Sequence, residues 1–313
     1  MTALEEKINQ LLSNSRIDVL HAPELFGEYS VHLLREDLIH PEISGNKLRK
    51  LKYNLLEAER LGKNELITFG GAYSNHIAAT AAAGHLFGFR TRGIIRGDEL
   101  TADSNETLQK AASLGMDFEF WSRTDYRLKD DPEVLKNLHH SFPGAYIIPE
   151  GGANNLGIQG CAELLKRPSD CSGYTHVVCA TGTATTLVGL ICSLKPGQKA
   201  LGISVLKENY LQQYVENQLS GKACGAGDWE INSTHHHGGY ARVNKPLIDF
   251  ICRFISLTGT FAEPVYTGKM LFALSKMCQE YYFAPDSKML AIHTGGLQGW
   301  NGFADLNPLK TSS

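Results

Sequence analysis

The segments best suited to chemistry are four short loops that combine glycine with hydroxyl or amide side chains. They span residues 70–76, 151–155, 181–186 and 294–296. Strand-to-helix turns favour glycine for positive φ and Ser, Thr or Asn as the N-cap, so one such loop alone could be purely structural. Segment 181–186 is the most specific, because a glycine flanked by hydroxyls at the start of a helix offers N–H groups and the helix dipole to an anion. We therefore predict a phosphate site there.

The surrounding sequence limits what kind of phosphate this site can take. No Walker-type lysine follows the segment, and the chain contains no Gly-x-Gly-x-x-Gly motif. Nucleoside triphosphates and dinucleotides are therefore disfavoured. A small monophosphate cofactor remains.

Lys47 is the candidate nucleophile of the chain. It follows Ser44-Gly45-Asn46 at the expected start of a helix, where the helix dipole and burial would both lower its pKa toward the free amine of Schiff-base chemistry. A basic run that contains Arg49, Lys50 and Lys52 follows, and such runs are often solvated helix faces. The residues alone leave both interpretations open.

The elements that must position these loops alternate between short apolar runs and segments of helical period, which favours an α/β fold with parallel sheets. Predicted strands are 66–69, 93–95, 118–121, 146–148, 177–180, 201–206 and 290–293. Predicted helices begin near Ser74, Asp103, Asp131 and Asn155, and others cover about 185–195, 210–220, 244–257 and 268–280. We expect two close-packed α/β domains with the site in the cleft between them, outside the carboxyl ends of the strands.

Composition narrows the class of protein. The chain has 313 residues, 42% of them hydrophobic, and a formal charge of −3 without a basic patch, which disfavours nucleic acid and anionic membranes as partners. No signal peptide or membrane-spanning apolar run is apparent, so we expect a cytoplasmic protein with a small-molecule partner. The seven cysteines lack Cys-x-x-Cys spacing, and we expect buried free thiols rather than a disulfide framework.

Ordered motifs along nearly the whole chain resemble one enzyme family. The motifs are Arg35-Glu36-Asp37, Gly45-Asn46-Lys47-Leu48-Arg49-Lys50-Leu51, Ser74-Asn75-His76, Gly151-Gly152, segment 181–186, Pro264-Val265-Tyr266-Thr267-Gly268-Lys269 and His293-Thr294-Gly295-Gly296. Together they resemble the family that contains 1-aminocyclopropane-1-carboxylate (ACC) deaminase and D-cysteine desulfhydrase. That family uses pyridoxal 5'-phosphate (PLP).

The resemblance implies a tryptophan-synthase-β fold (PLP fold type II) with two open, twisted, mainly parallel sheets flanked by helices and the cofactor between the domains. The large domain would comprise residues 1–48 and 160–313, and the small inserted domain residues 49–159. A homodimer is expected. Lys47 would carry PLP as a Schiff base, while Lys50 would remain on the surface.

The resemblance also assigns roles to individual side chains. Asn75 would contact the ring hydroxyl of the cofactor, and Ser74 would face the substrate and its carboxylate. Tyr266 would meet the ring and the substrate, and Thr267 or Thr294 would lie near the pyridine nitrogen. The phosphate site would be formed by Thr181, Gly182, Thr183, Ala184 and Thr185. Lys47, Ser74 and Tyr266 are thus the predicted catalytic residues.

The substrate prediction depends on the two threonines. Family members that open the cyclopropane ring carry Glu after the tyrosine and Leu after the histidine, whereas this chain has Thr267 and Thr294. A neutral hydroxyl makes the cofactor a weaker electron sink than a carboxylate does, which suffices when a good leaving group sits on Cβ. We therefore predict α,β-elimination from D-cysteine or a related β-substituted D-amino acid, giving pyruvate, ammonia and hydrogen sulfide.

Alternatives remain at the level of chemistry. They are ACC deamination to 2-oxobutanoate and ammonia, β-replacement, racemisation, and a catalytically idle cofactor- or amino-acid-binding protein. Tyr73 stands where the family often has Gln and could reshape the substrate pocket beside Ser74, Asn75 and His76. Two further departures are Ser44, where a second Gly is usual, and Thr185, which replaces a Gly but can add a hydroxyl to the phosphate site.

Three further sites have structural interpretations. His76 lies next to the substrate-facing residues and could be catalytic, but a histidine held by backbone partners is the simpler expectation. Residues 235–237 are consecutive histidines in a Gly-ended loop, which rarely converge on one ion, so we predict a mobile loop at the cleft mouth and no metal. Asp37, Glu263 and Lys269 are expected to be structural.

Overall fold

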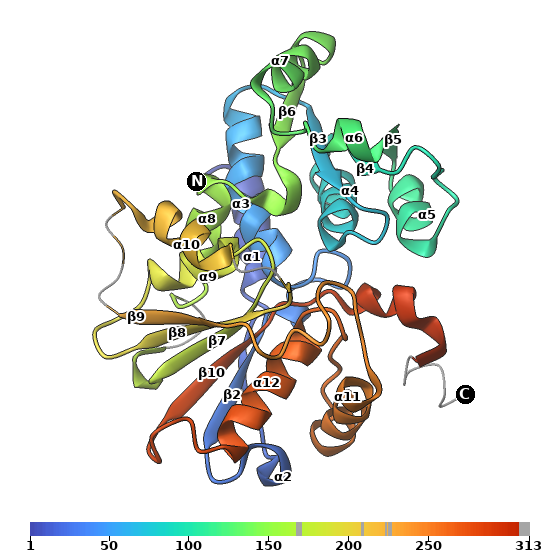
Figure 1. Ribbon diagram of the computed structural model, residues 1–313. Coiled ribbons are helices and arrows are strands. Elements are labelled where there is room, and N and C mark those ends of the chain that lie inside the picture. The colour runs from blue at the N-terminus through green and yellow to red at the C-terminus, as the bar shows by residue number, and fades with distance from the viewer. Residues whose placement is uncertain (167–170, 208–209, 223, 225–226, 307–313) are drawn as a thin grey trace.

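The structure, a computed structural model, describes residues 1–313 except 167–170, 208–209, 223, 225–226 and 307–313. Two sheets organise the chain (Figure 1). The larger sheet has the strand order β1-β2-β10-β7-β8-β9 and the smaller one β5-β4-β3-β6. Every neighbouring pair is parallel except β1 and β2. The predicted α/β class with two mainly parallel sheets is confirmed.

The strands have the following bounds. The large sheet contains β1 (Ile17–Val19), β2 (Ser30–Arg35), β7 (His176–Thr181), β8 (Lys199–Ser204), β9 (Asp228–Asn232) and β10 (Lys288–His293). The small sheet contains β3 (Glu65–Gly70), β4 (Arg90–Arg96), β5 (Met116–Trp121) and β6 (Ala145–Ile148). All seven predicted strands are present. The sequence patterns missed β1, β2 and β9, which are short or mix polar with apolar residues.

Helices cover both sheets. They are α1 (Ala3–Leu12), α2 (Pro23–Phe26), α3 (Asn46–Arg60), α4 (Asn75–Phe87), α5 (Glu106–Ser113), α6 (Arg123–Tyr126), α7 (Pro132–Ser141), α8 (Asn155–Cys161), α9 (Thr185–Ile191), α10 (Leu211–Leu219), α11 (Lys245–Thr258) and α12 (Thr267–Gln279). Short 3₁₀ segments are η1 (Glu36–Leu38), η2 (Glu150–Gly152), η3 (Cys171–Gly173) and η4 (Leu297–Leu306). Side-chain caps begin several helices, as Ser74 does for α4 and Asp131 for α7.

The apolar core lies on both faces of the large sheet. One cluster joins its strands to α2 and α12, and another joins them to α8 and α9. A third cluster packs α1, α3 and α4 against the small sheet. Every residue of β3, in the small sheet, is buried, as expected for a strand of a parallel sheet that is covered on both faces.

Two helices link the sheets at the level of the cleft. The helices α3 and α8 meet so closely that a Cβ on Gly160 would lie 1.8 Å from the carbonyl oxygen of Arg49. The predicted domain boundaries, 48/49 and 159/160, fall inside these same two helices. The division into residues 1–48 with 160–313 and 49–159 stays a prediction, as does the homodimer.

The cysteines differ in part from the expectation. Cys192 and Cys224 form a disulfide, so the prediction that all seven are free thiols is wrong for this pair. Among the free cysteines of the described chain, four are buried and Cys252 is exposed. The sequence could not indicate the pair, because residues 32 positions apart come together only through the fold. Within the described residues, no helix is both long and apolar enough to cross a membrane.

Candidate active site

Lys47 lies in the first turn of α3. Its amine donates a hydrogen bond to Asn46 Oδ1 at 2.9 Å, and Asn46 Nδ2 donates in turn to Thr186 Oγ1 at 2.7 Å. The amine also lies 5.9 Å from the centroid of the Tyr266 ring. The start of α3 therefore connects the lysine to α9 on one side and to the α12 region on the other.

The environment of Lys47 favours a neutral amine. Although the side chain keeps partial access to solvent, desolvation by the surrounding protein, together with the smaller effect of the nearby Lys50 charge, lowers its pKa to about 7. An amine with this pKa is substantially unprotonated near neutral pH, as a Schiff-base nucleophile must be. Burial and the charge of Lys50 are thus the two causes of the lowered pKa.

The basic run after Lys47 is buried, so the solvated-face interpretation and the surface position predicted for Lys50 are both wrong. Only 1% of Arg49 and 4% each of Lys50 and Lys52 is exposed. Arg49 forms a buried ion pair with Glu36, and Lys52 pairs with Glu163. The run is buried because α3 packs between α8 and the small sheet, a tertiary effect that a local charge pattern cannot reveal.

Lys50 reaches the predicted phosphate segment. Its amine donates to Thr183 Oγ1 at 3.3 Å, and Thr183 Oγ1 lies 3.1 Å from Thr185 Oγ1. Between these two threonines Ala184 adopts a left-handed backbone conformation, with φ of 56°, which costs a non-glycine residue about 1 kcal/mol or more. A cation, two hydroxyls and a strained backbone turn are therefore gathered at one point, as an anion site requires.

Two glycines at segment 181–186 lie close to neighbouring side chains and leave space for them. A Cβ on Gly182 would come within 3.1 Å of the Tyr266 ring, and one on Gly151 would come equally close to Thr183. Larger residues at these places would therefore crowd the Thr183 side chain and the tyrosine. Segments 151–152 and 181–185, far apart in sequence, therefore lie against each other.

We call segments 151–152 and 181–185 the first wall of the candidate site, and the start of α4 the second wall. Ser74 Oγ caps the helix by accepting hydrogen bonds from the amides of His76 and Ile77. Asn75 Oδ1 is buried and has no hydrogen-bond partner. Tyr73, in contrast, is 53% exposed. Asn75 lies against the 294–296 turn, because a Cβ on Gly296 would approach Asn75 Nδ2 to 2.5 Å.

His76 differs from the expectation that backbone groups hold it. Its Nε2 lies 2.9 Å from Thr68 Oγ1, and because that hydroxyl donates to Ile148 O, the imidazole must donate through Nε2. The other ring nitrogen, Nδ1, is buried without a partner. Burial holds the pKa of His76 well below its usual value, and the charges of Lys47 and Lys50 act in the same direction.

The third wall is the segment that leads into α12. The side chains of Thr267 and Thr294 are buried, with their hydroxyl oxygens 3.4 Å apart. Glu263 is buried beneath them, and its carboxylate accepts hydrogen bonds from the amides of Val265, Tyr266 and Thr267. Burial raises the pKa of Glu263 to about 7. Both oxygens of the Glu263 carboxylate therefore accept hydrogen bonds from backbone amides.

Sequence reasoning gave no site role to Tyr240 and assigned Lys269 only a structural one. The buried amine of Lys269 donates to the carbonyl oxygens of His236 and Gly239, which anchors the histidine-rich loop to α12. The anchored loop places the Tyr240 ring 6.0 Å from that of Tyr266. The motif Tyr266-Thr267-Gly268-Lys269 was the available signal, but nothing in it indicated which carbonyl groups the lysine would meet.

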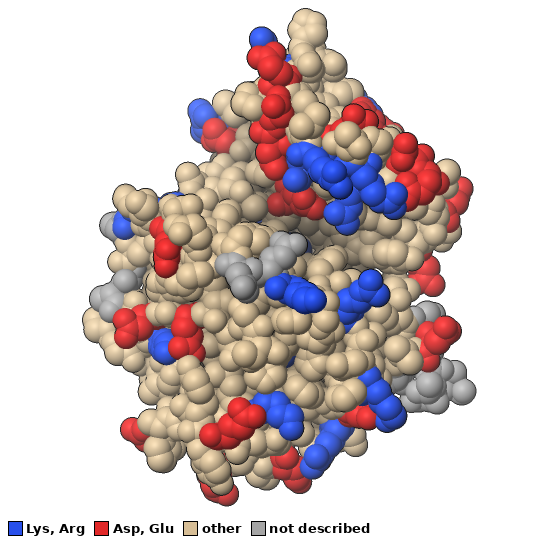
Figure 2. All heavy atoms as spheres, in the orientation of Figure 1, with Lys and Arg blue, Asp and Glu red and all other residues tan. Residues whose placement is uncertain are grey.

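Figure 2 shows the surface above these walls hollowed between the upper and lower parts of the molecule, with Lys and Arg side chains on both rims. The groups below fit a monophosphate that carries an aldehyde and a ring hydroxyl, as PLP does. Lys47 offers an amine of lowered pKa, and Lys50 with the threonines offers a phosphate cradle. The unpartnered Asn75 and the paired Thr267 and Thr294 remain for the ring.

Comparisons with known proteins agree with this fit. The bifunctional D-cysteine desulfhydrase/1-aminocyclopropane-1-carboxylate deaminase, mitochondrial, of Arabidopsis thaliana is 30% identical over 289 residues, which cover 85% of this chain and 72% of that protein. The D-cysteine desulfhydrase of Salmonella newport is 29% identical over 286 residues, which cover 85% of this chain and 86% of that protein.

Solved structures show the same fold. An ACC deaminase homologue superposes with a TM-score of 0.81 at 24% identity, covering 97% of this chain and 98% of its own. The O-acetylserine dependent cystathionine beta-synthase from Helicobacter pylori gives 0.66 at 13% identity, covering 96% and 97%. The family described as pyridoxal-phosphate dependent enzyme matches residues 12–295. The chain therefore belongs to the family of pyridoxal-phosphate-dependent enzymes.

Proposed function

We propose that this enzyme is a lyase that catalyses α,β-elimination from D-cysteine or a related β-substituted D-amino acid, releasing pyruvate, ammonia and hydrogen sulfide. The observation that carries the proposal is the buried hydroxyl pair of Thr267 and Thr294, 3.4 Å apart. Glu263, the buried carboxylate of this segment, is occupied by backbone amides. A neutral partner for the pyridine nitrogen suits a substrate with a good leaving group on Cβ.

The relatives support the same reaction class. Two of them are named for D-cysteine desulfhydration, and the Arabidopsis protein is also named for ACC deamination. At about 30% identity the substrate does not transfer with the fold. ACC therefore stays the second candidate substrate.

The proposal gives each wall a task in holding the cofactor. Lys47 would carry PLP as a Schiff base, and Asn75 would meet the ring hydroxyl with its unpartnered side chain. The phosphate would lie against segment 181–185, where Lys50 adds a positive charge to the threonine hydroxyls. When bound, PLP supplies an electron sink conjugated with the Cα of the substrate.

The protein residues would then move one proton and orient the substrate. The amine of Lys47, once displaced by the substrate amine, would take the proton from Cα, while the C–S bond breaks and the sulfur leaves with its electron pair. Water then hydrolyses the released enamine to pyruvate and ammonia. Ser74 would bind the substrate carboxylate through its hydroxyl hydrogen, because its oxygen already accepts from the helix amides.

Tyr266 would act beside Lys47. Its ring lies 5.9 Å from the Lys47 amine, and burial raises the pKa of its hydroxyl well above the usual value. A phenol held protonated can donate to the departing group but cannot serve as a base near neutral pH. We therefore assign base chemistry to Lys47 and orientation or proton donation to Tyr266.

The test is a panel of D- and L-amino acids with ACC, assayed together for α-keto acid, ammonia and sulfide. We expect sulfide and pyruvate from D-cysteine. Turnover of ACC without sulfide release from D-cysteine would overturn the threonine argument. A product that retains the amino group would instead indicate β-replacement or racemisation.

A second measurement tests the cofactor attachment separately. The purified protein should absorb near the visible edge, and the Lys47→Ala variant should lose this band while keeping its far-ultraviolet circular dichroism. Lys245→Ala is the matched control, because that side chain is 84% exposed. A protein that stays colourless after PLP is added would refute the attachment itself.

A further inference from the structure

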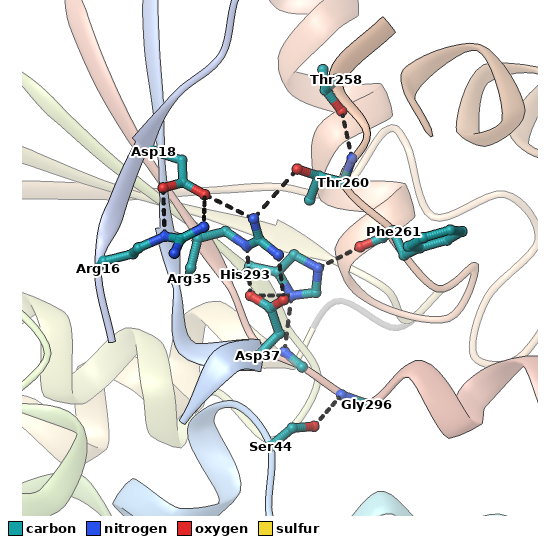
Figure 3. A network of polar contacts seen from close by, with 11 residues as sticks. Arg16, Asp18, Arg35, Asp37, Ser44, Thr258, Thr260, Phe261, His293 and Gly296 are labelled. Carbon is teal, nitrogen blue, oxygen red and sulfur yellow. Dashed lines mark hydrogen bonds and ion pairs between the residues drawn. The ribbon is translucent and has the colours of Figure 1, made fainter. Parts of the chain in front are cut away.

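His293 lies between two chain segments of the candidate active site. It is the last residue of β10, is fully buried, and immediately precedes Thr294. Its Nε2 lies 2.7 Å from the carbonyl oxygen of Phe261, and its Nδ1 lies 3.2 Å from the amide nitrogen of Gly295. Figure 3 shows the imidazole between Asp37 and Phe261, with Ser44 and Gly296 nearby.

These two contacts fix the tautomer. A carbonyl oxygen can only accept, so Nε2 must carry a hydrogen, and a backbone amide can only donate, so Nδ1 must be bare. The imidazole is therefore neutral in this arrangement. Both ring nitrogens are used, one toward each of two chain segments.

The segment on the Nδ1 side packs against the start of α3. A Cβ on Gly295 would lie 2.7 Å from the Gly45 nitrogen, and Gly296 donates a hydrogen bond to Ser44 Oγ at 3.2 Å. The amide of Asn46 donates to Thr294 O at 3.3 Å. A shift of this turn would consequently move the residues that precede Lys47.

The segment on the Nε2 side leads to the α12 wall. Phe261 is followed after one residue by Glu263, whose carboxylate holds the amides of Tyr266 and Thr267. The imidazole thus bridges the two segments whose threonines, at positions 267 and 294, face each other.

We propose that His293, as the neutral Nε2–H tautomer, is a positioning residue that holds the Thr294–Gly296 turn and the segment from Phe261 to Thr267 in register around the cofactor. It touches neither substrate nor cofactor, and it acts through Thr294 and Thr267. This role of His293 rests on the proposed function of the site. A misplacement of about 1 Å at such a site can cost roughly a hundredfold in rate.

Charged groups behind the imidazole define what protonation would do. Asp37 Oδ1 lies 3.6 Å from Nδ1, and Arg35 holds Asp37 through two hydrogen bonds while also bonding Asp18. A proton on Nδ1 would turn that nitrogen toward Asp37 and leave the Gly295 amide without its acceptor. Burial lowers the pKa of His293, with Asp37 opposing and Arg35 reinforcing this shift. Protonation should accordingly loosen the turn only under acid conditions.

The first experiment observes the tautomer in the wild-type holoenzyme. Nitrogen-15 NMR of labelled histidine should show His293 with a protonated Nε2 and a bare Nδ1 at neutral pH. The resonance is assigned by its absence from the His293→Asn protein. An Nδ1–H tautomer or an imidazolium at neutral pH would overturn the proposal. No substrate is needed, so failure of the proposed reaction would not affect the result.

The second experiment separates the two contacts. His293→Asn keeps an acceptor where Nδ1 lies, whereas His293→Gln keeps a donor that reaches toward Phe261 O. We expect the Gln variant to raise the dissociation constant of PLP about tenfold, because the freed turn contacts Asn75 and the α3 start. The Asn variant should retain PLP more tightly but change the circular dichroism of the bound cofactor.

His85→Asn and His85→Gln are matched controls, since this histidine of α4 is exposed. A purely structural role predicts that both His293 variants lose thermal stability while the folded fraction keeps wild-type PLP affinity and cofactor dichroism. That outcome would refute the positioning role. The NMR measurement remains decisive if one of the two variants fails to fold, because the His293 resonance is absent from both and either can assign it.

Discussion

The two sides of the active-site cleft differ in how completely their buried polar groups are partnered. On the large-sheet side, His293 uses both ring nitrogens and Glu263 uses both oxygens. At the start of α4, on the small-sheet side, Asn75 Oδ1 and His76 Nδ1 are buried without partners. An unpartnered buried group costs about 1–3 kcal/mol. At these residues, the large-sheet groups have their partners within the protein, whereas Asn75 and His76 each keep a buried polar atom that a bound ligand could engage.

This difference separates stability from function. Substitutions on the partnered side should reduce stability as well as function, because they break contacts that exist without ligand. Substitutions of the unpartnered groups should weaken ligand binding and leave the free protein unharmed. The comparison can be tested by substitutions on both sides.

Gly45→Ala should have the largest effect. Gly45 has φ of 72°, and an added Cβ would lie 1.7 Å from Thr294 O. Backbone strain and this clash together should lower the free energy of unfolding by about 3 kcal/mol or more. Chemical denaturation of the variant measures the loss.

The matched control is Gly27→Ala. Gly27 has a similar φ of 60°, but nothing lies within 4 Å of the added Cβ. Only the conformational cost of roughly 1–3 kcal/mol, which Gly45→Ala shares, should appear there. Equal losses in the two variants would show that the backbone contact between Gly45 and the Thr294 turn is unimportant.

Lys50→Met should have the next largest effect, on cofactor binding. Lys50 is buried against Thr183, and its amine would lose a charge-assisted contact with the phosphate. We expect the dissociation constant of PLP to rise roughly tenfold to a hundredfold. An absorbance titration measures it, with the exposed Lys136→Met as control. Unchanged affinity would place the phosphate elsewhere.

The pH dependence of cofactor attachment tests the charge state of Lys47. Its pKa is lowered to about 7, and only the neutral amine attacks an aldehyde, so the attachment rate should rise with pH and level off above about 7. Stopped-flow absorbance after mixing PLP with the apoprotein gives the profile. Because the charge of Lys50 lowers this pKa, Lys50→Met should move the midpoint to higher pH. A midpoint near the ordinary lysine value in the wild type would contradict the assignment.

Much of the fold could be predicted from local patterns. Apolar runs located seven strands of the two mainly parallel sheets, and capping residues such as Ser74 and Asp131 marked helix starts closely. The strands β1 and β9 escaped detection because each is short and only partly buried. Their pairing depends on neighbours distant in sequence, which periodicity does not report.

In the candidate site, too, local sequence indicated some features, whereas others depend on tertiary contacts. The loop at 181–185 could be selected as a candidate anion site from its glycine and hydroxyls alone, because these residues are adjacent in the sequence. The burial of Lys50 was not, because a lysine on a basic helix face looks solvated until α8 and the phosphate segment are placed against it. The disulfide of Cys192 and Cys224 and the hydrogen bond from His293 to Phe261 likewise depend on contacts between distant segments.

Asn75→Ala should change the stability of the apoprotein least, and it tests the unpartnered side directly. Because Asn75 Oδ1 has no partner to lose, the free energy of unfolding should stay within about 0.5 kcal/mol of the wild type or increase. The dissociation constant of PLP should nevertheless rise about tenfold, as a lost hydrogen bond to the ring predicts. Denaturation of the apoprotein and a PLP titration give the two values.

Asn46→Ala is the informative counterpart, because this asparagine also begins a helix but has both side-chain atoms engaged, with Thr186 and Lys47. Its removal leaves a buried hydroxyl without its donor and should lower the free energy of unfolding of the apoprotein by about 1–3 kcal/mol. If Asn75→Ala destabilised the apoprotein as much as Asn46→Ala does, Asn75 would have a partner in the free protein. The proposed difference between the two sides of the cleft would then be wrong for Asn75, the residue on which it mainly depends.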